Sequence, residues 1–246
     1  MIKSLLIVMM LNSFGLIMCS KESTVSNSSA AASVGKAGSN ARFTIVGNYL
    51  YTLDGSDIVS YDITTPNSPI KKNRVQVGDD IETLYPYNNM LFIGASTGMY
   101  AYGLTDPAVP KKLSVVRHVR ACDPVVVHGN YAYVTLRAGT NCGGGNVLHV
   151  YDVTDVFSPV LKKTITIPFP NGLGINGDAL YVTYSGGVRL FNINQPINPV
   201  FIKDILEPTA SDVIPYNNTL IVQLDKGASF YDISIALQPT FISRIN

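Results

Sequence analysis

The sequence is poor in charge and lacks the patterns of surface helices. Charged residues make up 14% of its 246 residues, and the formal net charge is +1. It has no basic stretch interleaved with aromatic side chains, the usual footprint of a nucleic-acid-binding protein. Long amphipathic helical patterns are missing after residue 40. These absences argue against a nucleic-acid partner and favour a fold made of strands.

Histidine and cysteine are equally scarce. The chain has three of each, and none of them falls in a spacing typical of a metal site or a catalytic triad. The histidines, His118, His128 and His149, are therefore interpreted as structural. The sequence predicts no metal and no cofactor.

Turn signals, by contrast, recur five times. Each is a pair of Gly, Asn or Asp residues between two apolar runs, as two-residue hairpins with positive φ require. The pairs are Gly47-Asn48, Asn88-Asn89, Gly129-Asn130, Gly177-Asp178 and Asn217-Asn218. An aromatic residue follows each pair, and a proline follows each aromatic at a constant distance: Pro69, Pro110, Pro159, Pro199 and Pro239. A turn pair, an aromatic residue and a proline that recur five times in the same order indicate an internal repeat.

Each repeat is predicted to contain four strands, the first three of them apolar on both faces. That pattern is expected when a small sheet is buried between two neighbours. A repeat of about 40 residues with four strands is typical of a propeller blade. The sequence therefore predicts an all-β fold, a five-bladed β-propeller of four-stranded antiparallel blades over residues 41–246. The repeats span about 41–78, 79–119, 120–168, 169–206 and 207–246.

The N-terminus is predicted to be a targeting segment. An apolar run from Leu5 to Met18 is too short to span a membrane comfortably, which takes about 20 residues. It ends in Leu16-Ile17-Met18-Cys19, which resembles the lipobox of bacterial lipoproteins. The resemblance implies a signal peptide over 1–18 and a lipid such as palmitate on Cys19. Met18 is bulkier than the usual residue before the cysteine, so an ordinary secretory signal remains the alternative.

Residues 19–40 are rich in Ser, Ala and Gly and contain no aromatic residue. Such a segment cannot bury enough apolar area to offset the entropy of ordering it, so it is predicted to be a flexible tether. Ser20, directly after the cysteine, resembles the signal for sorting to the outer membrane. The expected location is therefore the bacterial cell envelope, with the lipid as the link to its outer membrane.

The third strand of each repeat carries a motif of its own. The five copies are DIVSYDITTPNSP, MYAYGLTDPAVP, VLHVYDVTDVFSP, VRLFNINQPINP and ASFYDISIALQP. These resemble LVIVD repeats, a bacterial β-propeller family, and the resemblance covers residues 41–246. The second and fourth copies depart from the Tyr-Asp pair, with Tyr102-Gly103 and Phe191-Asn192. The resemblance implies the fold and a cell-envelope location, and no particular reaction.

The third repeat contains an insertion with its own cysteine. Cys142 lies in the Gly-rich stretch Arg137–Asn146, and Cys122 lies just before the first strand of the same repeat. Because strands reverse direction at each turn, both cysteines fall at the same end of the blade. In an exported protein the sequence predicts a disulfide between Cys122 and Cys142.

The inner strands of a propeller start around its central channel, so residues at these starts form a ring at one mouth. The ring positions are Ala41, Glu82, Asp123, Asn171 and Ser211, with Asp79, Asp80, Arg120 and Asp212 close by. A polar ring there can bind a ligand, and it also fits solvated strand ends without a role. The insertion starts at the same mouth. The candidate ligand-binding residues are therefore Glu82, Asp123, Arg137 and Asn141.

Two functions fit this pattern. The first is a non-enzymatic binding or scaffold module of the cell envelope that recognises an unidentified protein or glycan through one face. The second is a glycosidase-like hydrolase in which Glu82 and Asp123 act as acid and base, at carboxyl separations of about 5 to 9.5 Å. The ring lacks a histidine, a metal set and a nucleophile, so the sequence favours binding and predicts no catalytic residue.

Overall fold

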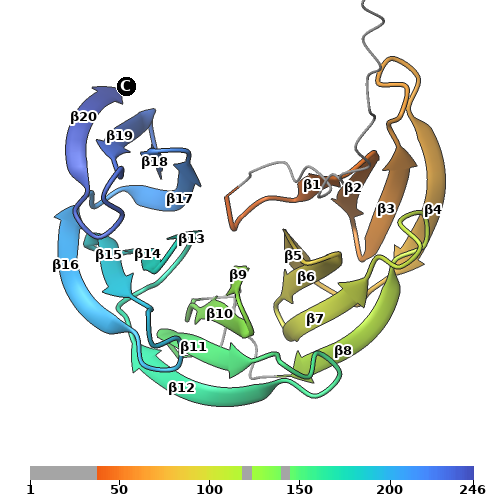
Figure 1. The fold of residues 1–246 in the computed structure, drawn as a ribbon, viewed down its shortest axis with the longest axis horizontal. Coiled ribbons are helices and arrows are strands. Elements are labelled where there is room, and N and C mark those ends of the chain that lie inside the picture. Colours follow the sequence, from red (N-terminus) through yellow and green to blue (C-terminus); the bar gives the residue numbers. More distant parts are fainter. Residues whose placement is uncertain (1–37, 118–123, 140–144) are drawn as a thin grey trace, which may run out of the picture. The chain divides into compact units, whose positions relative to one another are not determined.

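The computed structural model describes residues 38–117, 124–139 and 145–246, which belong to one compact unit. Every regular element among them is a β-strand, and the strands form five four-stranded sheets. No helix in the described part is long and apolar enough to cross a membrane. The predicted fold class is confirmed: the five sheets are the five blades of a β-propeller (Figure 1).

The blades follow one another along the chain. Blade 1 contains β1 (Phe43–Val46), β2 (Tyr49–Asp54), β3 (Asp57–Asp62) and β4 (Ile70–Gln76). Blade 2 contains β5 (Ile81–Tyr87), β6 (Met90–Ala95), β7 (Gly98–Gly103) and β8 (Lys111–Arg117). Blade 3 contains β9 (Val125–His128), β10 (Tyr131–Leu136), β11 (Val147–Asp152) and β12 (Val160–Thr166). Blade 4 contains β13 (Leu173–Asn176), β14 (Ala179–Tyr184), β15 (Gly187–Asn192) and β16 (Val200–Leu206). Blade 5 contains β17 (Ala210–Tyr216), β18 (Thr219–Leu224), β19 (Ala228–Asp232) and β20 (Thr240–Ile245).

Within each blade the four strands pair in chain order and antiparallel. The first strand of each blade lies innermost, and these inner strands contact one another from β1 to β5, β9, β13 and β17 (Figure 1). The hairpins between first and second strands use the predicted turn pairs. Gly47, Asn88, Gly129, Gly177 and Asn217 all have positive φ, the conformation that Gly and Asn tolerate best.

The aromatic residue of each repeat stands at a β-bulge. The register between third and fourth strands shifts at Tyr61, Tyr102, Tyr151, Phe191 and Tyr231. In every blade except blade 2, which has Gly103, the following Asp or Asn caps the next turn: for example, the Asp62 carboxylate accepts a hydrogen bond from the Thr64 backbone N–H at 3.0 Å. In the repeated Tyr-Asp pair, the Tyr therefore marks the bulge that bends the blade, and the Asp stabilises the start of the outer loop.

Neighbouring blades are joined by apolar clusters and, at three of the four junctions, by a tyrosine hydroxyl, whereas blade 2 has Phe92 at the equivalent position. Separate buried clusters fill the four junctions from blade 1 to blade 5. Tyr51 and Tyr133, on second strands, donate hydrogen bonds to Pro107 and Pro196 carbonyls in the outer loop of the following blade, at 2.8 and 3.1 Å. Tyr181 donates in the same way to the Ala236 carbonyl. Residues at repeated positions therefore supply the contacts between one blade and the next.

The junction between blade 5 and blade 1 differs from the other four. The blades form an arc that is open between β17–β20 and β1–β4 (Figure 1). Val126 and Tyr133, which face the following blade from blade 3, are buried, whereas their counterparts Ile214 and Ile221 in blade 5 are half-buried. Phe43 of blade 1 is 58% exposed. Among the described residues, no buried apolar cluster joins the two end blades.

Candidate functional site at the channel mouth

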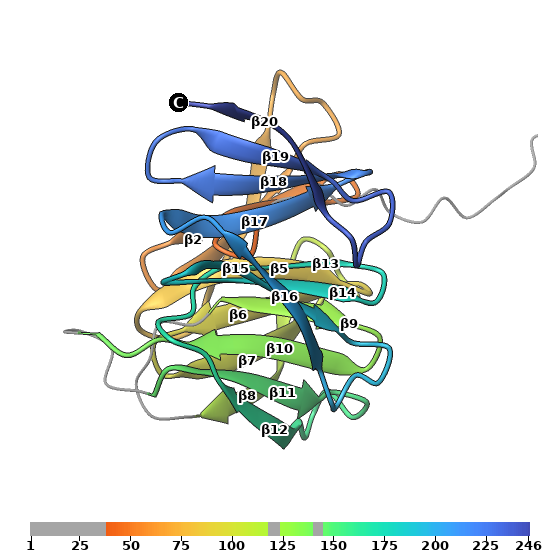
Figure 2. The ribbon, with the colours of Figure 1, turned by 90° about the vertical axis from the view of Figure 1, so that its left-hand side faces the viewer.

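All strands cross the molecule along roughly the same axis, in alternating directions, so their ends lie at two opposite faces (Figure 2). One face, called here the mouth, holds the starts of the inner strands and the hairpins between second and third strands. The other face, called here the base, holds the hairpins between first and second strands and the loops between third and fourth strands. The predicted site residues Glu82 and Arg137 lie in β5 and just after β10. The residues Cys19, Asp123 and Asn141, and the predicted pair Cys122–Cys142, lie outside the described residues.

A cavity of about 280 Å³ opens at the mouth and is shared by three blades. Arg137 comes from blade 3, Asn171 and Tyr184 come from blade 4, and Ser211 and Asp225 come from blade 5. Three of these positions were singled out from the sequence, Arg137 as a candidate binding residue and Asn171 and Ser211 as ring positions. The structure brings them together around one cavity.

The cavity has a rigid frame because the backbone of the ring positions links the blades. The Asn171 carbonyl accepts a hydrogen bond from Thr135 Oγ1 of blade 3 at 2.6 Å. The Ser211 carbonyl accepts from Thr183 Oγ1 and from the Gly172 N–H of blade 4, both at 3.2 Å. These bonds satisfy backbone groups that would otherwise be unpaired next to the channel. The ring positions therefore have a structural role as well as lining the cavity.

Tyr184 forms an aromatic wall of the cavity and is held in place by an ion pair. The Arg189 guanidinium lies over its ring, 4.6 Å from the centroid. Arg189 donates two hydrogen bonds to the Asp204 carboxylate, at 2.8 and 2.9 Å. Burial, together with the neighbouring Asp204 carboxylate, raises the pKa of Tyr184, so its phenol stays protonated. The cavity thus combines an oriented aromatic ring with Arg137 and Asp225, one exposed charge of each sign.

Asp212 lies beside the cavity and is buried, with 4% of its surface exposed. Its carboxylate accepts hydrogen bonds from Ser39 Oγ and the Asn40 N–H at 3.2 Å, and from the Val213 N–H at 2.9 Å. Burial raises the pKa of Asp212 to about 6. The close approach leaves no room for a Cβ at Gly172. Asp212 therefore has a structural role, because it holds the chain segment before blade 1 against the first strand of blade 5.

Ser39 completes this link. Its hydroxyl also accepts a hydrogen bond from the Leu173 N–H at 2.6 Å, so it touches blade 4 as well as blade 5. Ser39 and Asn40 stand at the end of the segment predicted as a tether, and nothing in their composition signalled this contact. The chain entering blade 1 is thus bound to the opposite end of the arc.

Glu82 is half-buried and is not among the residues that line the cavity. Its carbonyl accepts a hydrogen bond from the Arg42 guanidinium at 3.4 Å. The separation between the Glu82 and Asp123 carboxyl groups, on which the hydrolase hypothesis depends, is not defined because Asp123 lies outside the described residues. Within the described residues, no group of three or more His, Cys, Asp or Glu side chains could hold a metal ion.

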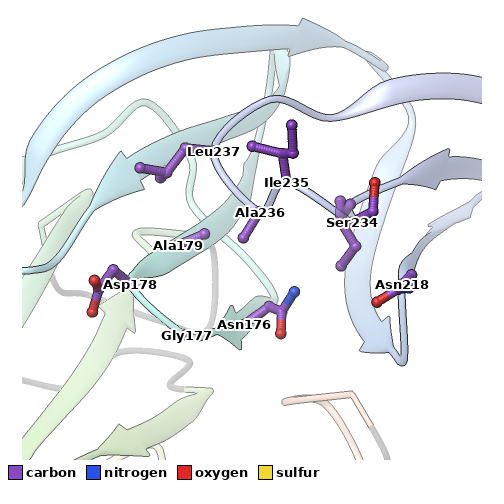
Figure 3. Close-up of a pocket in the computed structure, with 10 residues that line it drawn as sticks. Asn176, Gly177, Asp178, Ala179, Asn218, Ser234, Ile235, Ala236 and Leu237 are labelled. Carbon is purple, nitrogen blue, oxygen red and sulfur yellow. The ribbon is translucent and has the colours of Figure 1, made fainter.

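A second cavity, of about 450 Å³, lies at the base between blades 4 and 5. Figure 3 shows small side chains at its centre, with Ala179 of blade 4 close to Ala236 of blade 5. Polar side chains stand at its edges, among them Asn176, Asp178 and Asn218. This cavity follows from the junction between the two blades, where the Tyr181 hydroxyl binds the Ala236 carbonyl.

No protein-family model matches the chain, and no curated protein matches it either. Solved structures do match. A functionally unknown protein from Desulfotomaculum acetoxidans superposes with a TM-score of 0.64 at 14% identity, over 81% of this chain and 68% of that one. BamB from Moraxella catarrhalis superposes with a TM-score of 0.53 at 14% identity, over 87% of this chain and 73% of that one. A chain of the mitotic checkpoint complex gives 0.60 at 14% identity, over 81% and 63%. At these identities the likeness shows a shared β-propeller fold.

Proposed function

We propose that the protein is a non-enzymatic binding module of the bacterial cell envelope, and that a protein partner docks on its mouth. The observation that carries the proposal is the cavity shared by blades 3, 4 and 5, with Arg137 and Asp225 at its edge. Exposed groups of opposite charge on a rigid frame select a partner by electrostatic complementarity. Loops on a rigid scaffold are where recognition residues usually gather.

The anchor belongs to the same proposal. The resemblance of residues 16–19 to a lipobox supports a lipid on Cys19, and the resemblance to LVIVD repeats supports a cell-envelope location. Ser39 and Asn40 enter blade 1 next to Asp212, at the mouth. The similar chain in the mitotic checkpoint complex belongs to a protein assembly, which fits a scaffold role for this kind of fold.

Charge reversals test the proposal. Arg137→Glu and Asp225→Lys each invert one exposed charge at the cavity, and Asp178→Lys makes the same kind of change at the base. The wild-type protein and the three variants are cross-linked to envelope fractions, and the captured proteins are quantified by mass spectrometry. We expect one partner to be lost from both mouth variants and kept by Asp178→Lys.

Two results would overturn the proposal. The first is a partner that all variants retain, or that only Asp178→Lys loses, because the mouth would then play no part. The second comes from a glycan array probed with the same proteins. Binding to a glycan that depends on Arg137 and Asp225, without a protein partner, would make the protein a glycan-binding module.

A further inference from the structure

Blade 2 lacks an ion pair that two other blades have at the start of the outer loop. In blade 1, Lys72 lies 3.3 Å from the Asp62 carboxylate, and in blade 3, Lys162 lies 3.5 Å from that of Asp152. The equivalent residues of blade 2 are Gly103 and Leu113, identified by the register of the third and fourth strands around the bulge. Blades 4 and 5 also lack the lysine, with Ile202 and Ile242 at its position, but only blade 2 of the five has no side chain at the acidic position.

The missing side chain at Gly103 coincides with a cavity of about 590 Å³. Its walls include Gly103 and the apolar side chains of Val75, Val109 and Leu113, with Val75 contributed by blade 1. A Cβ added at Gly103 would lie 3.4 Å from the methyl groups of Leu113, so any longer side chain there would enter the space. The volume falls in the range of pockets that hold small molecules, about 300 to 1,000 Å³.

Charged groups at the edge of this cavity favour an anion. Lys111 and Lys112 both line it and both are exposed, and Asp106 is the acidic residue of the lining. The Asp106 carboxylate already accepts a hydrogen bond from the Ala108 N–H at 2.9 Å. The Lys112 ammonium lies over the Tyr100 ring, 5.1 Å from its centroid, which keeps it close to the blade. Two cations therefore stand beside an apolar space.

We propose that this cavity binds a small amphipathic molecule with an unbranched apolar body and one acidic head group. The apolar body lies on Leu113, Val75 and Val109, where burial removes its surface from water. The acidic group lies at the edge, between Lys111 and Lys112. The cavity is at the base, away from the mouth, so this proposal does not depend on the proposed protein partner.

The matched variant introduces into blade 2 the ion pair that blades 1 and 3 have. Gly103→Asp combined with Leu113→Lys rebuilds the Asp–Lys pair of blades 1 and 3 and fills the cavity with polar atoms. The control introduces the same two residues at the equivalent positions of blade 4, Asn192→Asp and Ile202→Lys. Thermal unfolding checks that both double variants fold.

Octanoate is the probe, and its binding is measured by isothermal titration calorimetry. We expect saturable binding to the wild-type protein and to the blade 4 control, and an affinity at least tenfold lower for Gly103→Asp/Leu113→Lys. Octyltrimethylammonium, with the same chain length and a cationic head, should bind at least tenfold more weakly than octanoate. Equal affinity of the folded blade 2 variant would overturn the site, and equal affinity for the two head groups would overturn the role of the lysines. Absence of saturable octanoate binding to the wild-type protein would overturn the proposal as a whole.

Discussion

The buried Asp212 carboxyl should make the fold less stable as the pH rises. Its pKa is raised from 3.8 to about 6 in the folded protein, mainly by burial. A group whose pKa is higher in the folded state stabilises that state below its unfolded pKa, and this contribution is lost as the pH rises through the folded pKa. A difference of about two units corresponds to roughly 3 kcal/mol. The loss should therefore fall between about pH 4 and pH 6.

The substitution Asp212→Asn removes the titration and keeps a similar shape. Urea unfolding of both proteins between pH 4 and pH 7 gives the difference in their free energies of unfolding at each pH. Carboxyl groups with lowered pKa, such as Asp204, contribute in the opposite direction, but they act equally in both proteins and cancel in the difference. The wild-type protein should lose about 3 kcal/mol relative to the variant over this range. A difference that stays constant with pH would refute the reasoning.

Four further predictions concern other parts of the chain. Arg244→Ala should cost about 2 kcal/mol of unfolding free energy, because it leaves the buried Glu207 carboxylate without the guanidinium that lies 2.5 Å away; urea unfolding measures this, and a cost near zero would contradict it. Tyr181→Ala, at a closed junction, should cost about 4 kcal/mol, whereas Ile221→Ala, at the open side, should cost about 1 kcal/mol; equal costs would mean that the open side is packed like the others. Cys19→Ala should abolish the incorporation of labelled palmitate, and a wild-type protein without label would end the lipoprotein hypothesis. A thiol assay on the unreduced protein should find Cys122 and Cys142 oxidised, and their bond, closing a loop of about 20 residues, should contribute roughly 3 kcal/mol; two free thiols would disprove the disulfide.

The repeat made the fold predictable from the sequence. Each turn pair needed a residue that tolerates positive φ, so Gly and Asn marked the hairpins where the structure has them. In blade 3 the predicted turn pair Gly129-Asn130 lies between β9 and β10. Strands that are apolar on both faces predicted that each sheet packs against its neighbours. The pattern could not show that the repeated aromatic stands at a bulge, because a bulge depends on the register with the next strand.

The site was only partly predictable. Asn171 and Ser211 were predicted because they lie at the starts of inner strands, and Arg137 because the insertion in the third repeat begins at the same mouth. Tyr184 and Asp225 also line the cavity, and they come from hairpins that carry no signal beyond the repeat itself. Gly103 was visible as a departure from the Tyr-Asp motif, but its partner Leu113 lies across the sheet. The sequence alone does not show that these two positions are neighbours, because that depends on how the third and fourth strands pair.

Because the arc is open, the first and the last blade are each stabilised by fewer apolar contacts than the blades between them. Among the described residues, blades 2, 3 and 4 each pack on two apolar neighbours, whereas blades 1 and 5 each pack on one, so the blades behave as a linear series of coupled units. Unfolding can then begin at either terminal blade and advance inward, and exchange of backbone amides should be fastest there. The contact of Ser39 with Asp212 acts as a clasp between these ends. Without the hydrogen bonds that Ser39 and Asn40 make to blades 4 and 5, the two ends of the arc could separate while the three central blades stay packed.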